Sequence, residues 1–456
     1  MKTNRFEIDM IHGPLMPKLI SFALPLMLSS VLQLLFNAVD IIVVGNFTGS
    51  EALAAVGSTS ALINLYINLF TGISLGANVL AARKYASGAY DEMSDAVHTA
   101  ILTALISGCC MILAGFFGSR PSLILMGTPA NVIDQSVLYM RIYFLGMPFF
   151  MLYTYGAAIL RAVGDTRRPL LVLTAAGLLN AGLNMILVIV FHLGVAGVAI
   201  ATVISQLLSC ILVLRILMTS DGPYRLDLRK LRIHKYSFLQ ICQVGFPAGI
   251  QSTVITFSNT LLQSSVNSFG SVSMAGYTAA NNLMSFLYVG VNSITQAGMS
   301  FTSQNLGARK FRRLDRILID CLILEVLLPL FMGGMGFLFG PKLLGIYTTD
   351  AAVITAGMEI VSITFLPYFL CGFMDMFPGI MRGMGHASVP MILSIIGTVG
   401  TRVLWIFFYF PHHRSLGELF LSYPLSWFAT FLMQSICFYF VRKITREKYQ
   451  AKDSLD

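Results

Sequence analysis

The chain has 456 residues, of which 56% are hydrophobic and only 11% are charged, and its mean hydropathy is +0.76. Soluble globular domains have about 25% charged residues, so this composition excludes most soluble enzymes, disordered regulators and nucleic-acid-binding proteins. The net charge of +9 would suggest nucleic acid in a soluble protein, but here the position of each basic residue along the chain is more informative. The composition predicts a polytopic membrane protein.

Twelve apolar segments follow one another along the chain, separated by charged residues or by Gly and Pro. Each is long enough for a membrane-spanning helix of about 20 residues, and none shows the alternation of a β-barrel strand. No short apolar region with a cleavage site begins the chain, so we expect no signal peptide. The spans are expected at 15–45, 52–82, 96–118, 130–158, 169–191, 194–218, 236–267, 272–305, 313–340, 351–380, 387–410 and 416–441.

The basic residues define an orientation. Of the 30 Lys and Arg residues, 25 fall on the N-terminus, the even-numbered connections and the C-terminus, whereas only Arg120, Lys342 and Arg414 fall on the opposite side. Arg141 and Arg402 lie within spans. Because basic loops stay in the cytoplasm, we expect a multi-pass protein of the cytoplasmic membrane with both termini inside. The excess of basic residues then reflects the membrane topology and gives no reason to expect a nucleic-acid partner.

The two halves of the chain repeat each other. Pro25 is matched by Pro247 at an offset of 222, and Gly49 by Gly270 at an offset of 221. The clearest match pairs 161–169 (RAVGDTRRP) with 382–390 (RGMGHASVP), in which Arg, Gly and Pro all recur at 221. An even number of spans per repeat makes the halves parallel repeats about an axis along the membrane normal.

These features predict an all-α membrane protein with twelve transmembrane helices in two parallel six-helix pseudo-symmetric lobes around a central cavity. We expect an N-terminal lobe at 1–218, a cytoplasmic inter-lobe linker at 219–235 and a C-terminal lobe at 236–456. Rocking of two such lobes gives alternating access. The architecture indicates a carrier; a channel, a receptor or a membrane enzyme is the alternative.

Polar side chains of the N-terminal lobe gather at one depth. Apart from Asp134 near the start of the fourth span, Asp40 is the only acid within its spans. Asn180 and Asn184 share a helix face at a spacing of i, i+4, and Thr202 lies at similar depth on the sixth span. A carboxylate, two amide oxygens and a hydroxyl suit a protonatable carboxyl or a small hard cation. We therefore expect a cation-coupling site at these four residues, with a purely structural bond between helices as the alternative.

Three further residues of the first span are candidates for roles in transport. Pro25 frees a backbone carbonyl and allows the helix to bend, so it is a candidate gate, and a static kink is the other interpretation. Gln33 and Asn37 lie between Pro25 and Asp40 and are candidates for the substrate cavity.

The C-terminal lobe carries different charges. Glu359 and Arg402 lie at matching depth, so we expect a buried ion pair between them. Asp375 lies toward the cytoplasmic side and is either a cavity residue or the partner of a nearby cation or polar group. The seventh span contains no acid.

Three loop motifs resemble those of the multidrug and toxic compound extrusion (MATE) family. They are 160–169 (LRAVGDTRRP), 304–308 (QNLGA) and 381–385 (MRGMG), and they accompany an Asp fifteen residues after a Pro in the first span. The resemblance covers essentially the whole chain. It implies secondary active efflux of organic, often cationic and amphipathic, compounds in exchange for H+ or Na+.

The resemblance also bears on the coupling site. Family members with a cation site in the N-terminal lobe use an Asp in the first span, an Asn and an Asp in the fifth and a Thr in the sixth, which Asp40, Asn180 and Thr202 match. Asn184 departs from that pattern, because the family commonly has Asp there, and the loss of a negative charge weakens Na+ binding. The choice between H+ and Na+ stays open. Another branch uses a Glu in the seventh span, which this chain lacks, and Asp375 resembles that branch's second acid only loosely.

A lipid-linked precursor flippase of the same superfamily is the alternative function. Carriers of anionic lipids are expected to have several cavity Lys or Arg residues, whereas only Arg141 and Arg402 lie within spans and away from the span ends here. The sequence contains no nucleotide loop, metal-ligand spacing or nucleophile triad. We expect no enzyme activity, no cofactor and no metal apart from Na+ at Asp40, and we expect small organic molecules and membrane lipid as the partners of a monomer.

Overall fold

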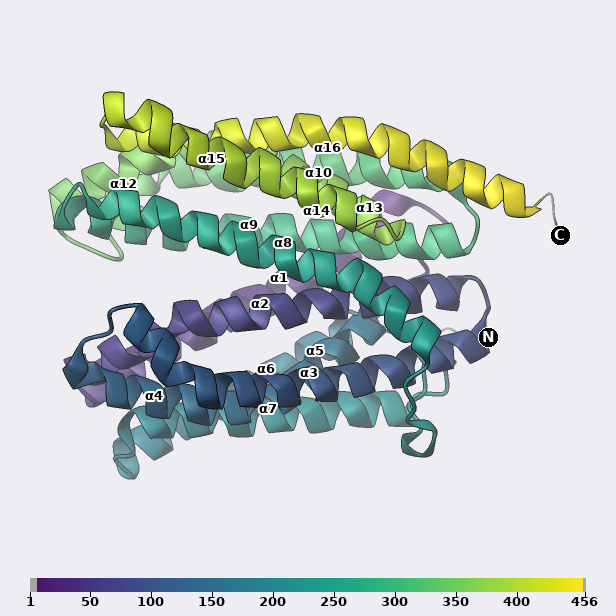
Figure 1. The fold of residues 1–456 in the computed structure, drawn as a ribbon, viewed down its shortest axis with the longest axis horizontal. Helices are drawn as coiled ribbons and strands as arrows, with labels where there is room; N and C mark the ends of the chain where they lie inside the picture. The colour runs from purple at the N-terminus through teal and green to yellow at the C-terminus, as the bar shows by residue number, and fades with distance from the viewer. Residues whose placement is uncertain (1–5, 454–456) are drawn as a thin grey trace. The chain divides into compact units, whose positions relative to one another are not determined.

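The computed structural model describes residues 6–453, and every regular element in that part of the chain is a helix (Figure 1). The fold suits a bilayer, because a helix satisfies its backbone hydrogen bonds within its own segment. The α-helices are α1 (Leu15–Phe47), α2 (Ser50–Ala86), α3 (Tyr90–Leu125), α4 (Ala130–Leu145), α5 (Met147–Ala162), α6 (Arg167–Asn184), α7 (Gly194–Thr219), α8 (Lys235–Asn267), α9 (Ser271–Gly307), α10 (Phe311–Leu338), α11 (Gly340–Leu344), α12 (Ala351–Thr364), α13 (Phe369–Gly383), α14 (Ser388–Ser394), α15 (Thr401–Leu404) and α16 (Leu416–Asp453).

The internal repeat predicted from the sequence is confirmed by the helix boundaries. α2 and α9 begin 221 residues apart, as do α3 and α10 and also α6 and α14, and α5 and α13 end 221 residues apart. Gly49 and Gly270 both have a φ of 93°, directly before α2 and α9. Gly164 and Gly385 have φ values of 94° and 90°, a left-handed conformation that favours glycine.

The chain folds into two compact units that exchange parts of their first helices. Unit 1 comprises the segment ending at Asp9 together with Leu28–Gly249, and unit 2 comprises Met10–Met27 and the chain from Ile250 onward. α1 passes from unit 2 to unit 1 two residues after Pro25, and α8 passes from unit 1 to unit 2 two residues after Pro247. Proline weakens a helix at such a point because its ring displaces a backbone hydrogen bond. The lobe boundaries predicted from the sequence stay a prediction.

Close packing accounts for the exchange. In unit 1 the first half of α8 lies against α2 so tightly that a Cβ at Gly76 would stand 2.0 Å from the Ile241 carbonyl oxygen. In unit 2 the first half of α1 packs on α9, where the Phe22 and Phe301 rings meet edge to face with centroids 5.7 Å apart. Each half-helix thus packs one face closely against the unit to which it belongs.

Within residues 6–453, eight helices are long and apolar enough to cross a membrane, or up to ten if each of two bent pairs forms one span. The bent pairs are α4 with α5, at 47°, and α12 with the helical segment that ends at Gly383, at 45°. α8 and α9, with 33 and 37 residues, are long enough but are not among these apolar helices. The prediction of an all-helical membrane protein is confirmed, while the count of twelve spans stays a prediction.

Two of the expected spans are less regular than the sequence indicates. The fifth continues from α6 into a π-helical segment, Met185–Val190. The eleventh alternates between α-helix and π-helix, with π-helical turns at Ile395–Gly400 and Trp405–Tyr409. Such segments occur frequently at functional sites, and the first begins directly after Asn184.

Candidate cation-coupling site

The Asp40 side chain reaches the site from the part of α1 that belongs to unit 1. One turn earlier on the same helix, the Phe36 ring covers Gly177 of α6, where a Cβ would stand only 1.8 Å from Phe36 Cε2. Only glycine fits under that ring without a shift. The contact holds α1 close to α6 and brings Asp40 within reach of the last turn of that helix.

A chain of hydrogen bonds connects the four predicted site residues in unit 1. Asn184 Nδ2 donates to Asp40 Oδ1 and also to Asn180 Oδ1, the latter over 3.2 Å. Asn180 Nδ2 in turn donates to Thr202 Oγ1 over 3.4 Å, and that hydroxyl donates to the Val198 carbonyl over 3.0 Å. The structure therefore brings together all four residues. Asn184 is the direct partner of Asp40, and Thr202 is joined to it through Asn180.

Burial makes this chain of polar groups costly to disrupt. Asn184 is fully buried and Asn180 nearly so, while Asp40 and Thr202 are partly buried. The Asn184 Oδ1 atom has no hydrogen-bond partner among the described residues. An unpartnered buried amide oxygen costs roughly 1–3 kcal/mol. The site therefore has one vacant acceptor next to its only carboxyl.

The other candidates of the first span lie apart from this chain. Pro25 is inside α1, on the part that belongs to unit 2. Gln33 and Asn37 are exposed on the part that belongs to unit 1, and no hydrogen bond joins either of them to Asp40. Their roles in gating and in a substrate cavity stay predictions.

The expected ion pair between Glu359 and Arg402 of unit 2 is not formed. Arg402 is buried; its Nη1 donates to Asn259 Oδ1 over 2.7 Å, and its Nε donates to Ser426 Oγ over 3.2 Å. Glu359 is exposed and accepts a 2.7 Å hydrogen bond from the Gly417 backbone. The two side chains meet α16 at different levels, Glu359 at Gly417 and Arg402 at Ser426, and neutral groups already satisfy Arg402.

Two acids of unit 2, the partly buried Asp375 and the buried Glu325, lie among polar partners. Asp375 shares a hydrogen bond with Tyr288 and lies near the Arg382 guanidinium, which agrees with the paired alternative for this residue. Glu325 on α10 received no role from the sequence. It is fully buried, 3.5 Å from Thr295 Oγ1, and its Oε2 has no hydrogen-bond partner in the described chain. Its position midway along an apolar span was the available signal.

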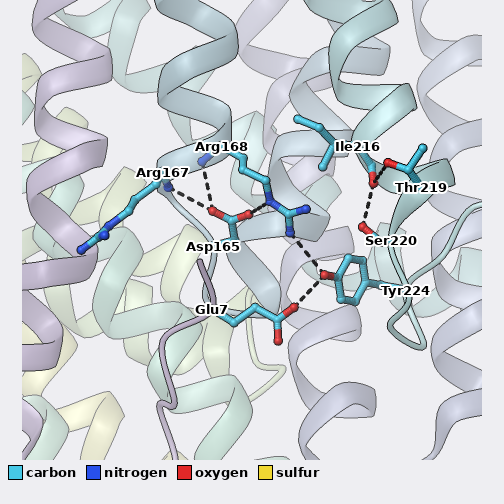
Figure 2. A network of polar contacts seen from close by, with 8 residues as sticks. All are labelled: Glu7, Asp165, Arg167, Arg168, Ile216, Thr219, Ser220 and Tyr224. Carbon is cyan, nitrogen blue, oxygen red and sulfur yellow. Dashed lines mark hydrogen bonds and ion pairs between the residues drawn. The ribbon is translucent and has the colours of Figure 1, made fainter. Parts of the chain in front are cut away.

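A second polar network occupies the end of unit 1 where α5 meets α6 (Figure 2). The buried Asp165 carboxylate accepts hydrogen bonds from the Arg167 and Arg168 backbone amides over 3.1 and 3.0 Å, and it pairs with the Arg168 side chain. Arg168 also donates to the Tyr224 hydroxyl, which donates to Glu7 over 2.7 Å. Burial, together with the Glu7 carboxylate, raises the pKa of Tyr224 and keeps its hydroxyl neutral.

The network explains the motif at 160–169 in structural terms. Ile8 N donates to the Gly164 carbonyl, and a Cβ at Gly164 would stand 2.4 Å from the Ile8 carbonyl oxygen. Glu7 also accepts a hydrogen bond from the Tyr85 hydroxyl at the end of α2. Glycine, aspartate and arginine of this motif thus fasten the segment before α1 to unit 1.

Among residues 6–453, no group of three or more His, Cys, Asp or Glu could hold a metal ion.

Two known proteins are similar to this chain over most of its length. The probable multidrug resistance protein YoeA of Bacillus subtilis (strain 168) is 28% identical over 437 residues, which cover 93% of this chain and 94% of that protein. The multidrug export protein MepA of Staphylococcus aureus (strain NCTC 8325 / PS 47) is 22% identical over 395 residues, which cover 86% of this chain and 87% of that protein.

Solved structures show the same fold at low sequence identity. A MATE protein in complex with MaL6 superposes with a TM-score of 0.90 at 20% identity, over 98% of this chain and all of that one. An outward-facing multidrug resistance MATE family transporter of the MOP superfamily gives 0.89, also at 20% identity and with the same coverage. The MatE family model matches residues 25–186 and 247–407, one match in each repeat. The chain therefore belongs to the MatE family, the family of multidrug and toxic compound extrusion transporters that its loop motifs resemble.

Proposed function

We propose that this protein is a secondary active antiporter that exports organic compounds, cationic and amphipathic ones above all, in exchange for a cation taken up at Asp40. The observation that carries the proposal is the Asp40 carboxyl bonded to Asn184 within a chain of buried polar groups. Ionisable groups inside spanning helices are costly and usually mark ion pathways. Relatives named for multidrug resistance and export support the substrate class.

The direction of the hydrogen bonds favours H+ as the coupling ion. Asn184 presents its N–H group to Asp40, whereas a small hard cation is held by oxygen atoms. Rotation of the Asn184 amide by half a turn would present Oδ1, which otherwise has no partner, to a protonated Asp40. A protonated carboxyl needs such an acceptor, so one amide serves both states of Asp40.

Alternating access is the proposed transport mechanism. Because α1 passes from unit 2 to unit 1 close to Pro25, a change in how unit 1 holds Asp40 acts on a helix that both units share. Pro25 is then the proposed gate, at the weakest point of the helix. The distribution of basic residues supports a cytoplasmic position for both termini, and because one chain contains both repeats, a monomer suffices.

Transport by the purified protein in proteoliposomes tests the proposal. We expect a pH gradient to drive export of a fluorescent cationic dye and Asp40→Asn to abolish that export. Asp134→Asn, which makes the same chemical change at an exposed position paired with Arg120, is the matched control and should transport normally. Full gradient-driven export by Asp40→Asn would refute the role of Asp40. Export that responds only to a Na+ gradient would show that Na+ is the coupling ion.

A further inference from the structure

A small pocket lies in unit 2 between the first turn of α10 and the last turns of α16. It has a volume of about 60 Å³, and three arginines, Arg312, Arg442 and Arg446, contribute to its wall together with Asp315 and Thr445. This end of unit 2 belongs to the face that the distribution of basic residues predicts to be cytoplasmic. The pocket shares no residue with the Asp40 site.

The pocket carries uncompensated positive charge. Arg442 pairs with Asp315 over 2.5 Å. The guanidinium groups of Arg312 and Arg446 are exposed and have no ion-pair or hydrogen-bond partner within residues 6–453. With three arginines and one aspartate, the wall of the pocket has a net charge of +2. A doubly or singly charged anion would be attracted to it.

The start of α10 departs from the charge preference of a helix. The N-terminal end of a helix favours acidic residues, because its free N–H groups carry partial positive charge. α3, the counterpart of α10 in the repeat, follows this preference with Asp91 and Glu92 in its first turn. α10 has Arg312 and Arg313 at those two positions and no acid in its first turn. The two arginines add their charge to the partial positive charge of the helix N-terminus, and this combination attracts an external anion.

The repeat shows what occupies the corresponding place in unit 1. In unit 2, Thr445 Oγ1 lies 3.3 Å from His386 Nε2. Thr445 corresponds to Tyr224 and His386 corresponds to Asp165, each at an offset of 221 residues. In unit 1 the Tyr224 hydroxyl donates to the Glu7 carboxylate (Figure 2). The chain therefore supplies its own anion in unit 1, whereas in unit 2 the counterpart position opens into a pocket lined by arginines.

We propose that this pocket binds the phosphate group of an anionic membrane phospholipid. Arginine forks match phosphate oxygens, and basic pockets at the cytoplasmic ends of spanning helices are suited to anionic headgroups. α10 and α16 are both apolar enough to cross the membrane, so the pocket opens where headgroups lie. Phe311, Leu314 and Met384 complete its wall and offer apolar surface to the glycerol and upper acyl carbons of a lipid. A soluble phosphate shares the charge and cannot use that surface.

Native mass spectrometry of the full-length protein in detergent tests the assignment. We expect phosphatidylglycerol to remain bound as one tight adduct and phosphatidylcholine to bind weakly. The double variant R312Q/R446Q should bind phosphatidylglycerol about 30-fold more weakly, since each basic residue near an anionic headgroup contributes about fivefold. Both side chains are exposed, so the variant should fold, which an unchanged unfolding temperature without lipid would show.

A matched control removes the same charge elsewhere on the same face. R225Q/R229Q changes two exposed arginines of the segment between α7 and α8, and it should retain the tight adduct. Equal loss in both double variants would overturn the site, because the effect would then come from overall charge. Displacement of the lipid by millimolar inorganic phosphate would overturn the choice of a lipid and identify a soluble phosphate as the ligand.

Discussion

Unit 1 and unit 2 hold different chemistry at corresponding positions of the repeat. In unit 1, Asn180 and Thr202 extend a hydrogen-bonded chain from Asp40. The residues 221 positions later in unit 2 are Thr401 and Tyr423, and the neighbouring buried cation, Arg402, lies over the Tyr423 ring at 4.3 Å from its centroid. Several helix boundaries recur at an offset of 221, whereas the residues that extend from the Asp40 carboxyl in unit 1 have counterparts beside the Arg402 guanidinium in unit 2.

We interpret this difference as a division of roles, with ion coupling in unit 1 and helix packing around Arg402 in unit 2. A carboxyl can take up and release a proton or a cation, whereas a guanidinium keeps its charge at any physiological pH. We therefore expect the exchange of ions at this depth to take place in unit 1, while Arg402 organises the helices of unit 2. The following predictions test this division, beginning with the largest effect.

Asp40→Asn should lower gradient-driven dye export to the rate of protein-free vesicles, because the amide cannot bind a proton in exchange. Its unfolding temperature should stay close to that of the wild type, since an amide still hydrogen-bonds to Asn184. Efflux from proteoliposomes and thermal unfolding in detergent provide the two measurements. Equal loss of stability and transport would indicate that Asp40 has a structural role only.

Arg402→Met should lower stability and leave gradient-driven export intact, the opposite of the result expected for Asp40→Asn. It leaves Asn259 and Ser426 without their donor, and we expect a loss of about 3 kcal/mol in the free energy of unfolding, in line with hydrogen bonds to charged groups. The folded fraction should still export dye in response to a pH gradient. If this fraction were folded but uncoupled, the division of roles between the units would be wrong.

Gly177→Ala should weaken the contact that positions Asp40. The added Cβ would overlap the Phe36 ring, so we expect a loss of about 2 kcal/mol from overpacking and reduced export. Phe36→Ala in the same chain should restore part of both losses. Gly182→Ala is the matched control on α6, because nothing lies within 4 Å of its Cβ position. A similar loss in the control would contradict the proposed contact.

The smallest expected effect concerns the network that includes Glu7. Tyr224→Phe removes the hydrogen bonds to Glu7 and Arg168 and should cost about 1 kcal/mol of stability. Thr445→Val, the counterpart change in unit 2, removes only the 3.3 Å contact with His386 and should cost less. Thermal unfolding of both variants measures the difference, and a larger loss in Thr445→Val would reverse this comparison of the two units.

Counting along the chain grouped four residues that the structure joins by hydrogen bonds, while their role in coupling stays a prediction. Because a helix rises by a fixed amount per residue, matching depths placed Asp40, Asn184 and Thr202 together. The same reasoning failed for Glu359 and Arg402, since counting from the expected span ends gave them one depth, whereas Glu359 meets α16 at Gly417 and Arg402 meets it at Ser426, nine residues further along. It also did not identify Asn184 as the direct partner of Asp40, which depends on how tightly Phe36 packs on Gly177.

Other features lie beyond sequence reasoning for a different physical reason. Arg312 and Arg446 contributed to the topology count, and only the packing of α10 against α16 shows that they share a pocket. The exchange of half-helices between the units could not be predicted either, because Pro25 and Pro247 mark weak points in α1 and α8 without indicating which unit each half contacts. The pocket and the exchange of half-helices both depend on tertiary packing.

The exchange of half-helices also affects the order in which the protein can assemble. Residues 10–27 are synthesised near the beginning, yet the unit to which they belong is completed only after residue 250 has been made. Early in translation these residues have no partner, and contacts between segments so distant in sequence form late. A nascent chain that stops after α7 would also lack residues 235–249 of unit 1. Neither repeat can therefore mature as an independent folding module, and the two must reach their final state together during biogenesis.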